Sequence, residues 1–107
     1  MASCPPEVIT KLVEVAGVDS NSPLIQLELR HLGGALARPP ADLSPIGRRN
    51  SRFTMEGVGA MPTPEVAQAV QAHLAYVAEE MRPYETGATY VNFLELAGAT
   101  PERVRAA

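Results

Sequence analysis

Tyr90 and Asn92 carry the side chains whose types and spacing could serve chemistry in this sequence. They stand two positions apart in residues 87–93 (GATYVNF), and alternation along a strand would point both to one face. A phenol and an amide on one face can hydrogen-bond a common ligand, or they can tie down a neighbouring loop. The residues themselves leave both interpretations open.

The usual catalytic and metal-binding patterns are absent from the sequence. Neither His31 nor His73 stands in a nucleophile motif, and no Gly-x-Ser-x-Gly occurs, so the sequence identifies no catalytic residue. Cys4 is the only cysteine, which excludes an internal disulfide and a zinc site built from cysteines. These three potential ligands are far apart in the sequence, and we expect no metal site.

The charge balance argues against a nucleic-acid partner. Nine Lys and Arg residues against twelve Asp and Glu residues give a net charge of −3. A protein that binds nucleic acid without sequence specificity needs concentrated positive charge to displace counterions. The densest cationic group, Arg48, Arg49 and Arg52, is typical of a solvated loop and also compatible with an anion site.

Length and composition predict one domain with a core of small aliphatic side chains. The chain has 107 residues, of which 46% are hydrophobic and only 5% aromatic, so Val, Leu, Ala and Met must fill the core. The N-terminus lacks a secretory signal, and no apolar run approaches the roughly 20 residues of a membrane span. We expect a soluble, cytoplasmic protein without a membrane partner.

Proline and hydroxyl residues mark the expected helices. Residues 3–16 carry two prolines in the first turn and end at Gly17, where glycine tolerates a left-handed conformation. Residues 64–81 follow a hydroxyl cap at Thr63 and carry the clearest apolar stripe. Thr100 opens a last helix with the same Thr-Pro-Glu pattern.

Alternation of apolar and polar residues predicts three strands, over residues 24–31, 52–61 and 88–96. The first has an apolar and a polar face, formed by Ile25, Leu27 and Leu29 and by Gln26, Glu28 and Arg30. In the second, Gly57 and Gly59 share a face and leave space for a helix or a ligand to approach closely.

The order of these elements predicts an α+β fold. Helix, strand, strand, helix, strand and a final helix start favour a mostly antiparallel sheet with helices packed on one face. The arrangement is that of a ferredoxin-like plait lacking a strand. We expect residues 1–107 to form a single domain.

Three segments in a fixed order carry a resemblance to a known family. They are residues 28–35 (ELRHLGGA), 87–93 (GATYVNF) and 101–107 (PERVRAA). With these segments the chain resembles the C-terminal substrate-domain region of the FAD-linked oxidases of the berberine-bridge-enzyme type. The resemblance covers the chain from the first strand onward.

The resemblance implies a division of labour between domains. In that family a separate N-terminal domain holds FAD, and the sheet of the substrate domain covers the isoalloxazine ring and lines the substrate cavity. Tyr90 and Asn92 would then face substrate or flavin. Phe93 stands where some members have a tyrosine base, which puts alcohol oxidation by that base in doubt.

The expected function is therefore that of a substrate-domain fragment or remnant of an FAD-linked oxidoreductase. It would be inactive alone and bind no cofactor by itself, with FAD held by a separate domain or chain. Two alternatives stay open: a small dimeric α+β cofactor-free oxygenase or isomerase, and a non-enzymatic interaction module. We also expect a homodimer, because loss of a flavin domain would uncover sheet surface.

Overall fold

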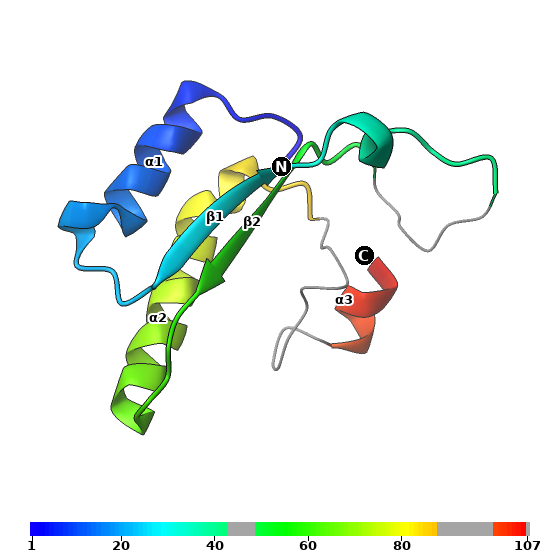
Figure 1. Cartoon of the computed structure of the whole chain (residues 1–107). Helices are drawn as coiled ribbons and strands as arrows, with labels where there is room; N and C mark the ends of the chain where they lie inside the picture. The colour runs from blue at the N-terminus through cyan, green and yellow to red at the C-terminus, as the bar shows by residue number, and fades with distance from the viewer. Residues whose placement is uncertain (43–48, 88–99, 107) are drawn as a thin grey trace.

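The protein is an α+β domain, as the order of its sequence elements predicts (Figure 1). A computed structural model describes residues 1–42, 49–87 and 100–106. Its helices and strands are α1 (Pro6–Ala16), β1 (Gln26–His31), β2 (Phe53–Val58), α2 (Pro64–Met81) and α3 (Pro101–Ala106). The predicted strand over residues 88–96 lies outside the described residues.

β1 and β2 pair antiparallel and divide their side chains between two faces. Leu27 lies opposite Gly57 and Leu29 opposite Met55 on one face of this pair. The even-numbered residues of both strands occupy the other face, since successive side chains alternate. The antiparallel prediction is confirmed.

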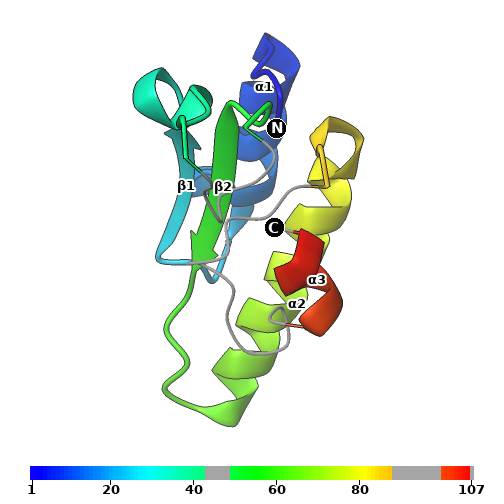
Figure 2. The same ribbon diagram turned by 90° about the vertical axis from the view of Figure 1, so that its right-hand side faces the viewer.

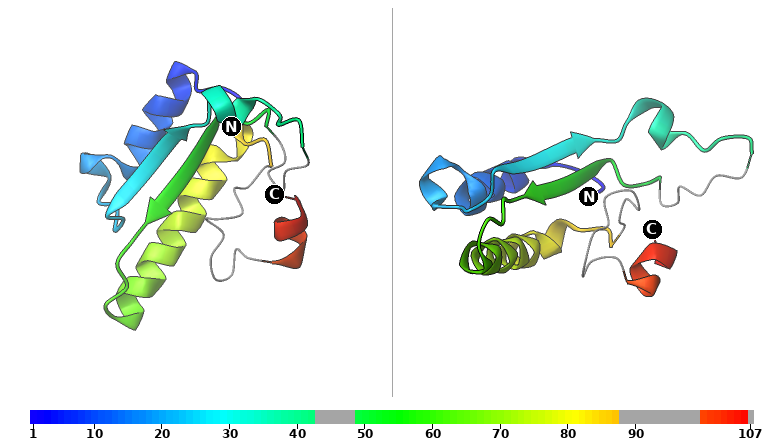
Figure 3. Two further views of the ribbon diagram at one scale, coloured as in Figure 1. Left: turned by 45° about the vertical axis from the view of Figure 1, so that its right-hand side comes forward. Right: turned by 60° about the horizontal axis from the view of Figure 1, so that its bottom comes forward.

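Both helices of the core pack on the apolar face of the sheet. Val8 and Val15 of α1 and Val77 and Met81 of α2 are almost fully buried and form one cluster. Leu27 and Met55 pack against this cluster from the sheet, and α2 forms a separate layer beside the strands (Figures 2 and 3). Helices on one face and a core of aliphatic side chains are both confirmed.

An ion pair links the two helices at the edge of this core. Lys11 of α1 lies 3.0 Å from a carboxylate oxygen of Glu80 on α2 and 3.2 Å from one of Glu14. The two carboxylates raise the pKa of Lys11, with Glu80 as the larger cause. The packing of α1 against α2 thus brings together two charged residues that are far apart in the sequence.

Both ends of α1 differ from the prediction. The helix begins at Pro6 instead of residue 3, because a residue before proline is driven out of the helical region, and Pro5 is extended with ψ 162°. Gly17 is extended too, with φ −71°. A left-handed cap is therefore wrong. Glycine is required there for space, since a β-carbon would lie 2.3 Å from the carbonyl oxygen of Val13.

Ile25 is 71% exposed, so its predicted place on the apolar face of the first strand is wrong. The N–H of Ile25 donates to the carbonyl oxygen of Val58, although Gln26 is the register partner of Val58. Two residues thus oppose one, which is the arrangement of a β-bulge and shifts the alternation by one position. β2 ends at Val58 because β1 offers no further partner.

α2 follows its prediction closely. The Thr63 hydroxyl accepts a hydrogen bond from the N–H of Val66 at 3.2 Å, and Pro64 occupies the first turn. The glycines of the second predicted strand let α2 approach closely: a β-carbon at Gly57 would lie 2.5 Å from Leu74, and one at Gly59 would lie 2.5 Å from Val70. A helix, then, uses the space that these glycines leave.

The first residue of the chain lies against β2. The carbonyl oxygen of Met1 accepts hydrogen bonds from the N–H groups of Arg52 and Phe53, at 2.8 and 2.9 Å. Its α-amino group donates to the carbonyl oxygen of Phe53 at 2.8 Å. Nothing in the sequence pattern predicts this contact, which joins segments 52 positions apart.

Candidate functional site

The two residues singled out by the sequence, Tyr90 and Asn92, lie outside the described residues, as does Phe93. The site is therefore built from the part of the chain that the structure describes. Its strongest candidate is the face of the β1–β2 sheet opposite the helices. We call this surface the open face; its residues are Gln26, Glu28, Arg30, Thr54, Glu56 and Val58.

The open face follows from strand alternation and register. The pairs are Gln26 with Val58, Glu28 with Glu56 and Arg30 with Thr54. Because Leu27, Met55 and Gly57 turn toward α1 and α2, these pairs turn away from them. Among the described residues, no helix packs on this face (Figure 3).

Glu28 is the centre of a hydrogen-bonded group on the open face. The side-chain amide of Gln26 donates to one carboxylate oxygen of Glu28 at 2.8 Å, and the Arg30 guanidinium pairs with the other. Glu56 stands directly across the sheet from Glu28. Two like charges opposite each other are unfavourable, and the pairing of Arg30 with Glu28 offsets this repulsion.

This arrangement suits recognition better than catalysis. An amide, two carboxylates and a guanidinium offer hydrogen-bond donors and acceptors on a surface that remains accessible, with the Arg30 side chain 47% exposed. Covalent catalysis needs a nucleophile beside a base. The open face carries neither a cysteine nor a histidine, and Thr54 has no base opposite it.

His31 is held by packing at the end of β1. Its ring lies 5.0 Å from the ring of Phe53 and rests over Gly33, where a β-carbon would be 2.4 Å from the imidazole. A β-carbon at position 33 would displace this ring, which lies at the far end of the exposed His31 side chain. Within residues 1–42, 49–87 and 100–106, no three His, Cys, Asp or Glu side chains gather as metal ligands.

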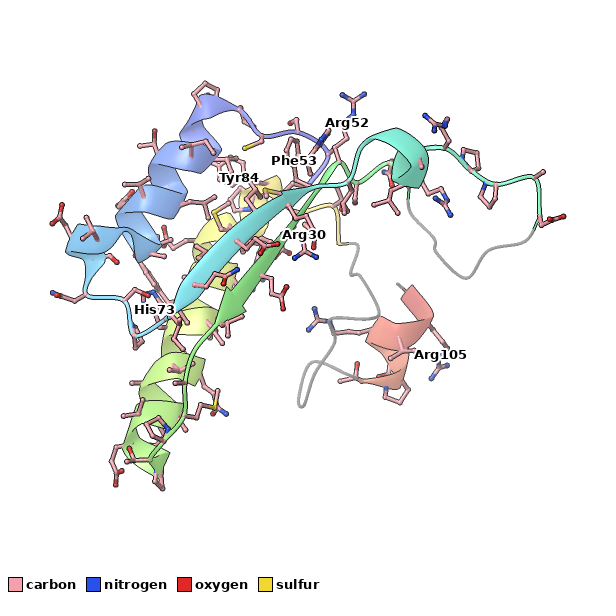
Figure 4. The ribbon with its side chains drawn as sticks, viewed as in Figure 1. Arg30, Arg52, Phe53, His73, Tyr84 and Arg105 are labelled. Atoms are coloured by element: carbon pink, nitrogen blue, oxygen red, sulfur yellow. The ribbon has the colours of Figure 1, made fainter. Side chains whose placement is uncertain are left out.

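His73 lies on α2, beside the apolar stripe (Figure 4). Its ring is 5.8 Å from that of Tyr76, one helical turn away. The Nε2 atom is buried without a hydrogen-bond partner in the described part of the chain. A buried nitrogen of this kind costs free energy unless it is paired.

The cationic group of the sequence is divided by the fold. Arg48 lies outside the described residues, while a guanidinium N–H of Arg49 donates to the carbonyl oxygen of Leu36 at 2.8 Å. Arg52 is exposed and uses its backbone N–H to hold Met1. Arg49 thus ties the connection before β2 to the 3₁₀ turn Gly34–Ala37, in line with the loop interpretation.

A shallow groove runs between α1 and β1, with a volume of about 220 Å³. Its lining is almost entirely apolar, and Glu28 is the one charged residue along it. The lining residues are Ile9, Leu12, Val13, Ala16, Gly17, Leu27, Glu28 and Leu29. A ligand site normally brings several polar groups together in an apolar pocket, and this groove does not.

Comparison with known proteins finds no match among family models, curated proteins or solved structures. None of the helices in the described ranges combines the length and the apolar character that crossing a bilayer requires.

The polar positions of the first predicted strand already indicated part of the open face. The partners within it, Thr54 and Glu56, depend on a register that the sequence pattern does not give.

Proposed function

We propose that this chain is a substrate-domain fragment or remnant of an FAD-linked oxidoreductase of the berberine-bridge-enzyme type. In this proposal its open face covers a substrate or flavin that a separate domain or chain holds. The chain alone is inactive and binds no flavin, because the chemistry belongs to a cofactor whose main site is elsewhere. The proposed compartment is the cytoplasm.

The observation that carries the proposal is that the two faces of the β1–β2 sheet differ in what covers them. α1 and α2 cover one face with aliphatic side chains, whereas the other presents Gln26, Glu28, Arg30 and Glu56. A sheet with one solvated face is common, but an amide, carboxylates and a guanidinium in one cluster suit contact with a polar ligand or domain. The motif order in residues 28–35, 87–93 and 101–107 supports the same assignment.

The test joins the chain to its proposed flavin-binding partner. The gene next to this one is inspected for a reading frame encoding an FAD-binding domain, and the two chains are coexpressed and purified together. We expect a yellow complex, whereas this chain purified alone is colourless after gel filtration. The absence of such a frame, or stoichiometric FAD retained by the chain alone, overturns the proposal.

A pair of charge reversals locates the contact. Glu56→Lys changes the open face, and Glu79→Lys makes the same change of charge on α2, where Glu79 is 64% exposed and pairs with Arg82. We expect Glu56→Lys to weaken the complex at least about tenfold, since reversing a charge in a polar interface costs 1.4 kcal/mol or more. Glu79→Lys should change it less than about twofold, because exposed pairs contribute little. Equal effects would contradict an interface on the open face.

A further inference from the structure

The outer edge of β1 is unpaired within the described part of the chain. The sheet there has two strands in the order β1–β2. The N–H of Leu32 donates to the carbonyl oxygen of Arg52, so the even-numbered residues of β1 direct their backbone groups to β2. By antiparallel alternation, those of Leu27, Leu29 and His31 point to the outer edge. Free backbone groups of this kind recruit another strand.

Apolar side chains lie beside this edge. Ile9 and Val13 stand one turn apart on α1 and are 48% and 64% exposed, and both line the groove between α1 and β1. Residues four apart share one side of a helix. The free edge is therefore accompanied by an aliphatic stripe that the chain does not cover with its own described residues.

The charges of β1 fit an antiparallel copy of itself. When two β1 strands meet with Leu29 opposite Leu29, Glu28 of one copy faces Arg30 of the other, and the reverse pair forms across the axis. Opposite charges in facing positions stabilise a strand pair. A one-residue change of centre, to position 28 or 30, would set two glutamates or two arginines opposite each other, which is unfavourable.

We propose that a second copy of this chain binds the outer edge of β1, antiparallel and centred on Leu29. The two sheets join in the order β2–β1–β1–β2, with helices on one face of the continuous sheet. The Ile9 and Val13 stripes of the two α1 helices approach each other below the axis. A symmetric contact of this kind lets one surface serve both subunits.

This dimer does not rest on the proposed flavin contact. The dimer uses the backbone edge of β1, one side of α1 and the Glu28–Arg30 pairs along that edge, whereas the flavin or substrate contact is tested at Glu56 on β2, the strand away from this edge. Its test is made on the purified chain alone, without a flavin-binding partner. A failed dimer test therefore leaves the proposed function standing, and a missing flavin partner leaves the dimer standing.

The experiment is a charge swap followed by sedimentation equilibrium over a hundredfold range of concentration. Arg30→Glu sets Glu28 of each copy against a new glutamate of the other, and we expect the dissociation constant to rise at least about tenfold. The double variant Glu28→Arg plus Arg30→Glu restores opposite charges in both pairs and should recover the dimer. Because both side chains lie on the open face, these changes leave the core cluster of Val8, Val15, Val77 and Met81 intact.

Two lysine variants test the helical part of the interface. Val13→Lys adds a charge to the α1 stripe and should weaken the dimer by a similar factor. Met61→Lys is the matched control, because Met61 is 42% exposed and follows β2 away from the β1 edge. Circular dichroism melting checks that each variant is folded, and Arg30→Gln replaces Arg30→Glu should the latter unfold.

Each outcome bears on the proposal. A dimer that weakens with Arg30→Glu and Val13→Lys, returns with the double swap and ignores Met61→Lys supports it. A monomer mass that stays constant across the concentration range overturns it. So does a dimer that none of the β1 or α1 substitutions affects, since such a dimer uses another surface.

Discussion

The side chain of Val70 occupies the space in which a β-carbon at Gly59 would lie. That β-carbon would lie 2.5 Å from one γ-carbon of Val70 and 2.8 Å from the other. Val70 is fully buried, and a β-branched side chain has little rotational freedom with which to move away. Gly59 thereby sets how closely α2 approaches the chain that leaves β2.

We expect Gly59→Ala to lower the free energy of unfolding by about 1–3 kcal/mol, the usual cost of forcing an extra carbon into a packed site. Gly57→Ala is the matched control. There the obstructing atom is the terminal methyl carbon of Leu74, which can rotate, so the change should stay below about 1 kcal/mol. Urea unfolding followed by circular dichroism measures both variants, and equal losses would contradict this assignment.

The cap of α2 gives a second test. Thr63→Ala removes the hydroxyl that accepts from the N–H of Val66, and we expect a loss of about 1 kcal/mol. Thr10→Ala removes a hydroxyl that only donates back to Pro6 within α1 on an exposed surface. Alanine favours helix there, so stability should hold or rise slightly. Should Thr63→Ala melt at the wild-type temperature, the cap contributes nothing.

The α-amino group of Met1 makes stability depend on pH. Burial beside β2 lowers its pKa below the usual value near 8, with Glu85 acting in the opposite direction. In the window just below pH 8, the unfolded chain then binds more protons than the folded one. The free energy of unfolding should therefore rise as pH increases from the lowered pKa toward 8. The same contribution is lost when pH falls back through the lowered pKa.

Acetylation of the Met1 amine provides the control for this pH dependence. An acetylated chain has no α-amino group to titrate, so its stability should lose this part of the slope between pH 7 and 8.5. Thermal melting in matched buffers at constant ionic strength compares the two chains. Identical slopes would mean that burial of the amine has no effect on its titration.

His73 gives a prediction in the stabilising direction. Its Nε2 atom is buried without a partner among the described residues, so His73→Leu removes an unpaired polar atom and keeps an apolar side chain. We expect the free energy of unfolding to stay equal or rise by about 1 kcal/mol. His73→Gln keeps a polar group in the same place and should be less stable than the leucine variant. A leucine variant less stable than His73→Gln would show that the imidazole is paired.

Local signals predicted α2 and the two strands because helix caps and alternation depend on residues close in sequence. Thr63 and Pro64 start the helix through their own hydroxyl and ring, and Leu27 and Leu29 take one face by simple alternation. Ile25 departs from this alternation because a bulge forms opposite Val58. That bulge depends on how β1 meets β2, which no single strand specifies.

Only part of the open face could be predicted from the sequence, for the same reason. Gln26, Glu28 and Arg30 share a face in any straight strand, so the sequence indicates a polar row. Glu56 joins that row only through the register that sets it opposite Glu28. The sites carried over by family resemblance, Tyr90 and Asn92, remain predictions because they lie outside the described residues.

By itself the sequence determined the α+β class, the aliphatic core, the principal helix and the alternation of two strands, since these follow from spacing, caps and hydrophobic period. Only the tertiary structure decided the contact of Met1 with β2, the Lys11–Glu80 pair and the close approach of Val70 to Gly59. Each of these joins residues of different segments, and the first two join residues far apart in the chain. Their pairing depends on how the layers pack, and hydrophobic period along one segment carries no information about it.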